Sequence, residues 1–223
     1  MKAMVLAAGL GTRLRPITNT RPKALAELGG RTLLEITLER LKVSGIHDVI
    51  VNVHHFADMV VEYLKTNHNF GMNIEISREE ILLDTGGGLK KAGWFFEDSD
   101  EPFVLHNVDV ITDIDLARMA AFHHEQRALA TLAVQNRETS RYLLFDDQGL
   151  LRGRSATREP QFQSLGFAGI HVISPRLIGM MGNDEVFSII TTYLDLAARG
   201  ERIVGFPANE YAWKDVGRLK DLA

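Results

Sequence analysis

A loop rich in glycine and cations follows the first apolar run of the chain, residues 2–7. Gly9 and Gly11 precede Arg13, and Lys23 comes ten residues later. Glycines let a backbone approach a ligand closely, and successive N–H groups in such a turn can surround phosphate oxygens. Arg makes forked contacts with phosphate, whereas Lys supplies a mobile point charge. The loop is therefore predicted to bind a phosphate-bearing ligand.

Two better-known phosphate loops do not fit this stretch. The P-loop of many nucleoside triphosphatases needs Gly-Lys-Ser/Thr, and Gly11-Thr12-Arg13 does not supply it. The dinucleotide fingerprint needs a third glycine that opens a helix, and the chain continues here through Leu14. A nicotinamide-dependent dehydrogenase is therefore disfavoured.

Strands and helices alternate around this loop over the first 134 residues. Apolar or β-branched runs predict strands at 2–7, 48–53, 73–77, 103–106 and 128–134. Helical spacing of apolar residues predicts helices at 32–43, 57–66, 87–96 and 115–126. The alternation indicates a parallel sheet with helices on both faces.

The pattern changes after residue 134. The second half is predicted to contain a hairpin at 142–154, a polar loop at 158–163 and a strand at 167–173. A helix at 188–199, two short strands at 203–206 and 211–214, and a last helix after Gly217 are predicted to follow. We therefore expect one α/β domain, 1–223, with an alternating half at about 1–134 and a β-rich half at about 135–223.

Composition limits the remaining possibilities. The 223 residues are 45% hydrophobic and 24% charged, which is typical of a folded domain with a sizeable core. The net charge of -4 argues against a nucleic-acid partner. The absence of cysteine excludes disulfides and thiol chemistry. The first apolar run is too short for an export signal, and no run is long enough to span a membrane, so we expect a cytoplasmic protein.

The stretch from Ala7 to Thr18, followed by Arg21-Pro22-Lys23-Ala24-Leu25, closely resembles the motif of sugar-1-phosphate nucleotidyltransferases. It is most similar to the short N-acetylmuramate-1-phosphate uridylyltransferases and to mannose-1-phosphate guanylyltransferase-like proteins. The resemblance implies a Rossmann-like, mostly parallel sheet. Its nucleotide-binding half would cover about 1–134, and a β-rich sugar-binding lobe with the closing segment would cover about 135–223. It also implies the reaction of a nucleoside triphosphate, UTP or GTP, with a sugar 1-phosphate to give a nucleotide sugar and pyrophosphate.

The same resemblance assigns roles to individual residues. Catalytic roles fall to Arg13, Lys23 and Asp109, and Mg²⁺ ligation to Asp109 and Asp215. Sugar-side contacts fall to Asn107 and Gly169. Nucleotide binding is assigned to Leu6, Ala8, Gly9, Gly11, Thr12, Arg13, Lys23, Thr85 and Gly86. The chain departs from the family pattern at Asp84, where Glu is usual, and at Val108, where Gly is usual, so we expect Val108 to narrow the pocket.

Two alternatives stay open within this frame. A cytidylyltransferase for a phosphorylated alcohol or amine shares the N-terminal motif, and a non-catalytic nucleotide-sugar sensor would share the fold. A zinc site at the histidine pairs 54–55 and 123–124 is disfavoured, because adjacent side chains on a strand point to opposite faces. The pair at 123–124, near a helix end, is expected to be solvated or to complement the helix dipole.

Overall fold

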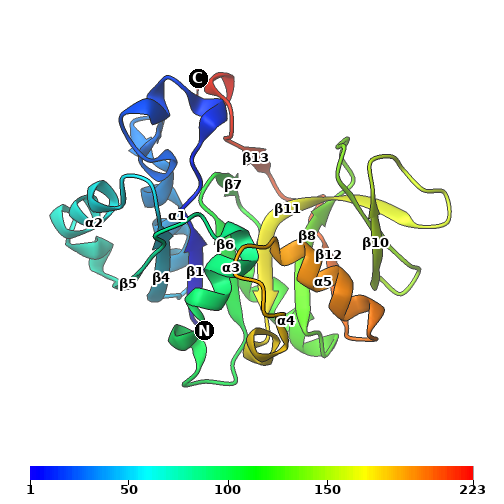
Figure 1. Ribbon diagram of the computed structural model, residues 1–223. Coiled ribbons are helices and arrows are strands. Elements are labelled where there is room, and N and C mark those ends of the chain that lie inside the picture. The colour runs from blue at the N-terminus through cyan, green and yellow to red at the C-terminus, as the bar shows by residue number, and fades with distance from the viewer. Residues whose placement is uncertain (223) are drawn as a thin grey trace.

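Strand β1 (Ala3–Leu6) lies in the middle of a nine-stranded sheet in the computed structural model, which describes residues 1–222. β1 runs parallel to β4 (Asp48–Val53) on one side and to β6 (Phe103–Asn107) on the other, and β5 (Asn73–Arg78) continues beyond β4. The carboxyl ends of these strands point to the same edge of the sheet, at the top of Figure 1. This confirms the predicted parallel arrangement.

The sheet continues through the second half of the chain by way of one reversed strand. β11 (Gln163–Ile173) runs antiparallel to β6 and to β8 (Ala130–Gln135), and β12 (Ile203–Pro207) lies parallel to β8. The first residues of β11 also pair with a hairpin formed by β9 (Tyr142–Phe145) and β10 (Leu151–Ser155). β11 begins at Gln163, so it is longer than the predicted strand at 167–173.

Five α-helices pack around the sheet: α1 (Leu33–Val43), α2 (Ala57–Thr66), α3 (Asp84–Lys91), α4 (Leu116–Glu125) and α5 (Ile189–Ala198). Thr32 caps α1, because its hydroxyl accepts from the Glu35 amide at 3.1 Å. The predicted helix at 87–96 is wrong in its bounds: α3 begins at Asp84, and a separate 3₁₀ turn covers Gly93–Phe96. After Gly217 only a 3₁₀ turn, Leu219–Asp221, forms among the described residues.

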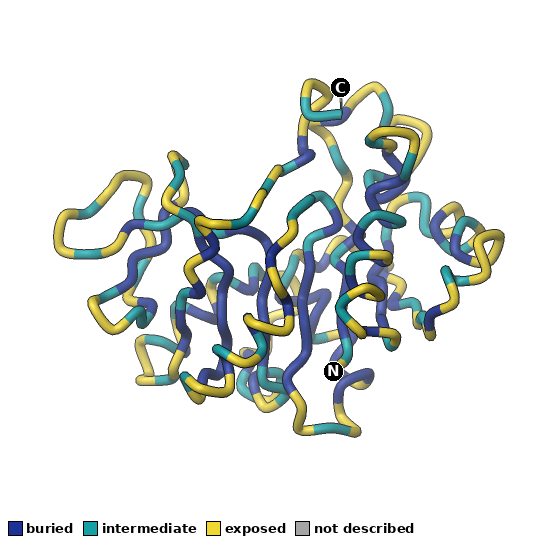
Figure 2. Tube along the Cα trace, turned by 180° about the vertical axis from the view of Figure 1, so that it is seen from behind, coloured by how far each residue is buried: buried dark blue, intermediate teal, exposed yellow. Residues whose placement is uncertain are grey.

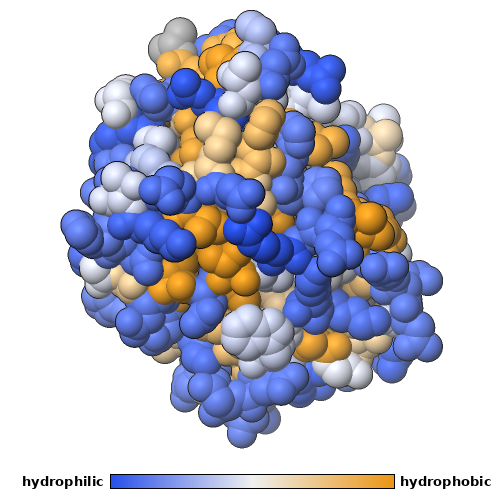
Figure 3. All heavy atoms as spheres, turned by 60° about the vertical axis from the view of Figure 1, so that its left-hand side comes forward, coloured by the Kyte–Doolittle hydropathy of each residue, from blue (hydrophilic) through white to orange (hydrophobic). Residues whose placement is uncertain are grey.

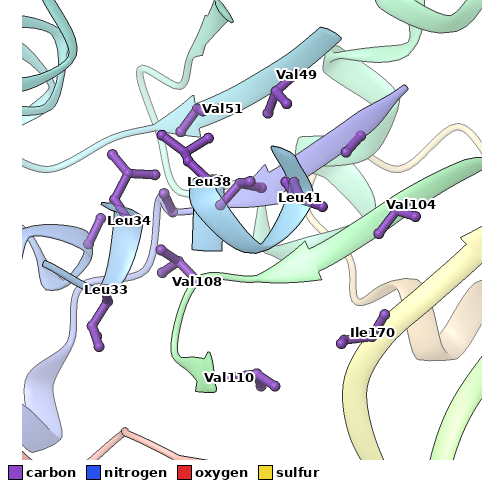
Figure 4. Packing of buried hydrophobic residues seen from close by; sticks show 14 of the residues in the cluster. Leu33, Leu34, Leu38, Leu41, Val49, Val51, Val104, Val108, Val110 and Ile170 are labelled. Carbon is purple, nitrogen blue, oxygen red and sulfur yellow. The ribbon is translucent and has the colours of Figure 1, made fainter. Parts of the chain in front are cut away.

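Alternation along the central strands divides the buried residues between two cores. Val49 and Val51 of β4 face α1, whereas Ile50 faces the opposite cluster, which contains Tyr193. Figure 4 shows the first core, in which α1 side chains lie over β4. Buried strands therefore run through the interior, with exposed loops around them (Figure 2). None of the helices within residues 1–222 is both long enough and apolar enough to cross a membrane.

The expectation of solvated histidines at 123–124 is wrong for His123, which is 2% exposed. Its ring nitrogens lie 2.9 Å from the Thr131 hydroxyl and 3.0 Å from the Ser174 hydroxyl. Burial lowers the pKa of His123 to about 4, so the ring is neutral at pH 7. His123 is thus a hydrogen-bonded core residue.

Two small ribbons complete the fold beyond the main sheet. β2 (Glu27–Leu28) pairs with β3 (Arg31–Thr32), and β7 (Val110–Thr112) pairs with β13 (Trp213–Asp215). The second ribbon was not fully anticipated, because β7 was not predicted. It brings the end of the chain back to the carboxyl edge of the main sheet (Figure 1).

Candidate active site

The glycine-rich loop folds back on itself, so that Lys23 returns to the end of β1. Gly11 has φ +61°, a conformation that L side chains rarely adopt. A Cβ at this position would lie 2.8 Å from Thr18 Cγ2 and 2.9 Å from Lys23 Cβ. Thr18 also donates its hydroxyl to the Gly11 carbonyl at 2.8 Å. Gly11 is therefore required by close packing within the loop.

Lys23 and Asp109 meet at the carboxyl edge of the sheet. Asp109 comes two residues after the end of β6, and its Oδ2 accepts a hydrogen bond from Lys23 Nζ. The two side chains are only 13% and 16% exposed, so the ion pair is shielded from water. Each charge thereby compensates the desolvation of the other.

Asp215 reaches the same place from the other end of the chain. In the β7–β13 ribbon Asp215 lies opposite Val110, and the Val216 amide donates to the Asp109 carbonyl at 2.8 Å. Asp215 Oδ1 is buried and finds no hydrogen-bond partner in the described part of the chain. Burial, together with the charge of Asp109, raises the pKa of Asp215, while Lys23 and Arg13 oppose the rise.

Arg13 lies on the outer side of this carboxylate pair. A Cβ at Gly217 would be 2.7 Å from Arg13 Nη2 and 2.7 Å from Asp215 Oδ1. Only glycine leaves room where the guanidinium and the carboxylate approach this backbone. The structure thus brings Arg13 and Lys23 of the glycine-rich loop together with Asp109 after β6 and Asp215 of β13.

A cavity of about 420 Å³ opens beside these charged groups. Its walls include seven residues to which the resemblance assigned a site role: Leu6, Ala8, Gly9, Lys23, Thr85, Asn107 and Asp109. Gly11, Thr12, Arg13, Gly86, Gly169 and Asp215 are not among its lining residues. Leu82 and Val186 line it and are 37% and 53% exposed. In Figure 3, apolar residues gather on one face of the molecule amid hydrophilic ones.

Two buried polar residues of the cavity were missed from the sequence. Asn52 accepts from the Ala7 amide at 2.7 Å and donates to Glu79 Oε1 at 2.6 Å. The other oxygen of Glu79 accepts from the Leu83 amide at 3.0 Å. This bridge ties the glycine-rich loop to the segment before α3. Asn52 was detectable as the one amide side chain in an otherwise apolar β-branched strand.

The glycines of α3 serve close packing against the segment before α5. The Gly86 amide donates to the Phe187 carbonyl at 2.9 Å, and a Cβ on Gly86 would lie 2.4 Å from the Phe187 ring. The Thr85 hydroxyl accepts from the Ile189 amide at 3.0 Å. Thr85 lines the cavity, whereas Gly86 is not among the residues that line it.

Asn107 and Gly169 are neighbours across β6 and β11. Gly169 has φ +78°, and a Cβ there would lie 3.1 Å from Asn107 Nδ2 and 2.6 Å from Val110 Cγ2. The expectation for Val108 is not supported. Val108 belongs to the cavity wall, but it is 3% exposed and its side chain packs in the core against α1 (Figure 4).

The carboxylate pair fits a hard divalent cation. Mg²⁺ is usually bound through one or two protein carboxylates, with water and substrate phosphates as further ligands. Asp109 and Asp215 supply two carboxylates, and the unpartnered Oδ1 of Asp215 is a buried acceptor that a cation would satisfy. Within residues 1–222 there is no cluster of three or more His, Cys, Asp or Glu residues that could hold a metal.

Comparison with known proteins agrees with this geometry. The model of the nucleotidyl transferase family matches residues 2–148. The chain is 35% identical to the N-acetylmuramate alpha-1-phosphate uridylyltransferase of Caulobacter vibrioides, over 96% of this chain and 91% of that protein. It is 34% identical to the mannose-1-phosphate guanyltransferase of Yarrowia lipolytica, over 100% of this chain but only 62% of that protein.

The fold is shared with solved structures as well. The inositol-1-phosphate CTP transferase of T. maritima superposes with a TM-score of 0.83 at 18% identity, covering 100% of this chain and 91% of the other. The predicted resemblance and fold class are confirmed by these matches. The chain belongs to the nucleotidyl transferase family.

Proposed function

We propose that the chain joins a nucleoside triphosphate to a sugar 1-phosphate, giving a nucleotide sugar and pyrophosphate. The observation that carries the proposal is the convergence of Arg13, Lys23, Asp109 and Asp215 beside one cavity, in a member of this family. Two cations and two carboxylates form a balanced set, suited to bringing anionic substrates together around a metal ion.

The cations take the phosphate groups in this proposal. Arg13 lies on the exposed side of the site and would bind the triphosphate and the leaving pyrophosphate. Lys23 would contact the α-phosphate and the incoming sugar phosphate, exchanging its bond to Asp109 for bonds to phosphate oxygens. The attacking oxygen is already anionic, so no general base is needed. Positioning and charge stabilisation supply the acceleration.

Asp109 and Asp215 would hold Mg²⁺, which when bound neutralises negative charge that develops on the phosphates. Lys23 and a metal ion would both bind the Asp109 carboxylate, but they need not share one oxygen atom. Lys23 occupies Oδ2 of Asp109, and Oδ1 of Asp215 is the acceptor without a partner. The metal ion would therefore bind first to Oδ1 of Asp215.

The cavity beside these groups would take the nucleotide, with Ala8, Gly9 and Thr85 in its wall. Asn107 and Gly169 would contact the sugar, from the second half of the fold. UTP and GTP are the proposed nucleotides, supported by the uridylyl- and guanyltransferase names of the two relatives above. Residues 1–134 would form the nucleotide half and residues 135–223 the sugar half.

The test is pyrophosphate release across a grid of the four nucleoside triphosphates against several sugar 1-phosphates, with Mg²⁺ present. We expect turnover with UTP or GTP and at least one sugar phosphate. Turnover only with CTP and a phosphorylated alcohol would replace this proposal with a cytidylyltransferase. Nucleotide-induced thermal stabilisation without any turnover would replace it with a sensor.

A further inference from the structure

The side chain of Arg137 contacts both β11 and β13. It lies two residues after β8, and its half-buried side chain passes between Gly166 of β11 and Trp213 of β13. The guanidinium carbon is 4.2 Å from the centre of the Trp213 ring. A Cβ on Gly166 would lie 2.9–3.0 Å from the Arg137 side chain. The planar guanidinium group thus lies between the backbone of β11 and the indole ring of Trp213 on β13.

The guanidinium group is hydrogen-bonded at a bulge in β11. The register between β11 and β8 shifts between Phe167 and His171, which interrupts the regular ladder of hydrogen bonds. Arg137 Nη2 donates to the Phe167 carbonyl at 2.7 Å, and Trp213 Nε1 donates to the Ala168 carbonyl at 2.8 Å. The first bond fastens the segment after β8 to the bulge and the second fastens β13 to it. The next residue of the bulge is Gly169.

The same strand carries the carboxylate with the unpartnered oxygen. Trp213 and Asp215 are two residues apart on β13, so their side chains lie on one face of the ribbon. Asp215 is close enough to act on the guanidinium: burial lowers the pKa of Arg137, and the charge of Asp215 opposes that effect. Arg137 therefore contacts the sugar-side bulge while sharing an electrostatic environment with Asp215.

We propose that Arg137 and Trp213 form a brace that sets the position of Asp215 relative to the sugar-side turn at Gly169. Arg137 is then a positioning residue. The inference rests on the proposed function, which makes Asp215 a metal ligand and places the sugar phosphate beside Gly169. Arginine suits this role because its planar group stacks on an indole while donating N–H bonds, which lysine cannot reproduce.

The direct test compares Arg137→Met with Arg158→Met. Arg158 is a matched control in the same half of the fold, 5.0 Å from the Tyr142 ring centre, with a surface ion pair to Glu138. Arg137→Met should raise the KM for the sugar 1-phosphate and weaken binding of Mn²⁺ alone, measured by electron paramagnetic resonance, each by about tenfold. Residues that orient metal ligands have effects of this size. Arg137→Lys should not rescue either value.

A second readout needs no turnover. The chain has two tryptophans, so a Trp94→Phe background leaves Trp213 as the sole indole reporter. In that background Arg137→Met should uncover the Trp213 ring and increase quenching of its emission by acrylamide, whereas Arg158→Met should not.

The outcomes separate the brace from the reaction. Equal Mn²⁺ affinity, equal KM for the sugar phosphate and equal quenching in folded Arg137→Met and Arg158→Met proteins would overturn the brace. If Arg137→Met does not fold, Arg137→Lys decides by the same measurements. Absence of pyrophosphate release from the unmodified protein would overturn the proposed function. The brace would then be judged by Mn²⁺ binding and quenching alone.

Discussion

Asp109 and Asp215 reach one site from two different kinds of structure. Asp109 follows β6 in the middle of the main sheet, and its carboxylate is paired with Lys23. Asp215 lies on a three-residue strand of a two-stranded ribbon, and its buried Oδ1 has no partner among residues 1–222. The first charge is compensated by the protein itself. The second is desolvated and only partly offset by the charges of Lys23 and Arg13, and one of its oxygens accepts no hydrogen bond within the described residues.

This difference indicates a division of labour. Strand β6 sets the position of Asp109 firmly, because it pairs with β1 along one edge and with β11 along the other, and Phe103–His106 are buried. The ribbon adds a second carboxylate from the far end of the chain, held by few ladder hydrogen bonds and by the contacts of Trp213. Function at such a site is gained at a cost in stability. The predictions below test each side of this comparison.

The largest effect is expected when either carboxylate is neutralised. If both act on one metal, Asp109→Asn and Asp215→Asn should each lower turnover by about 10³-fold, the upper range for loss of one preorganised charge-stabilising group. The double variant should be little worse than either single variant, because groups that act as a unit are strongly non-additive. The measurement is kcat from pyrophosphate release over a range of Mg²⁺ concentrations.

Asn keeps the shape of Asp and one oxygen ligand, so raising Mg²⁺ should restore part of the activity in each single variant. If the losses of turnover in the two single variants multiply in the double variant, and neither single variant responds to Mg²⁺, the carboxylates act separately. Asp215 would then be a turn residue before Gly217.

Lys23→Ala should lower turnover by about 10²–10³-fold, since it removes one charge-stabilising donor. The structure adds a second consequence, because Asp109 would lose its partner in a shielded position. We therefore expect the free energy of unfolding to fall by about 1–3 kcal/mol, measured by urea denaturation. Added Mg²⁺ should recover part of that loss. Near-normal pyrophosphate release would exclude the assigned role of Lys23.

Val108→Ala is expected to act mainly on stability. The side chain packs in the core against α1, so its truncation should cost about 2 kcal/mol, from lost apolar burial and the cavity left behind. The midpoint of urea unfolding measures this effect. If the midpoint stays in place and activity is redistributed among the nucleotides, Val108 shapes the pocket after all.

Much of the main sheet could be predicted from the sequence because its signals are local. Apolar strands followed by glycine or a polar residue identified β1, β4 and β6, and the position of Asp109 follows from the end of β6. The caps of α1 and α4 were readable from Thr32 and Asp115, whose side chains accept the expected amide bonds.

The contacts that close the site could not be predicted, because they join residues far apart in the chain. The β7–β13 ribbon consists of two three-residue strands more than 100 residues apart. The Asn52–Glu79 bridge and the stacking of Arg137 on Trp213 depend likewise on tertiary packing. His123 shows the converse error: its place near a helix end suggested solvent, but Thr131 and Ser174 surround it.

The smallest expected effect is also the most specific to Asp215. Burial raises the pKa of this carboxyl above its ordinary value of 3.8, so the native state holds the proton more tightly than the unfolded state does. Stability is therefore lost as the pH rises from 3.8 through the raised native value. At pH 7 and without Mg²⁺, the protein carries a desolvated charge that Asp215→Asn would remove.

Asp215→Asn should thus raise the thermal midpoint of the metal-free protein at pH 7 by about 2–4 °C, which corresponds to roughly 1 kcal/mol for a chain of this size. The gain should shrink as the pH falls through the raised native pKa toward 3.8, because the unmodified carboxyl takes up its proton over that range. Mg²⁺ should stabilise the unmodified protein more than the variant and so narrow or reverse the difference. Asp109→Asn is the matched control: it removes a carboxylate whose partner is Lys23 and should lower the midpoint. If both variants shift the thermal midpoint in the same direction, the charges of the two carboxylates are not compensated to different degrees, and the comparison drawn from the structure is wrong.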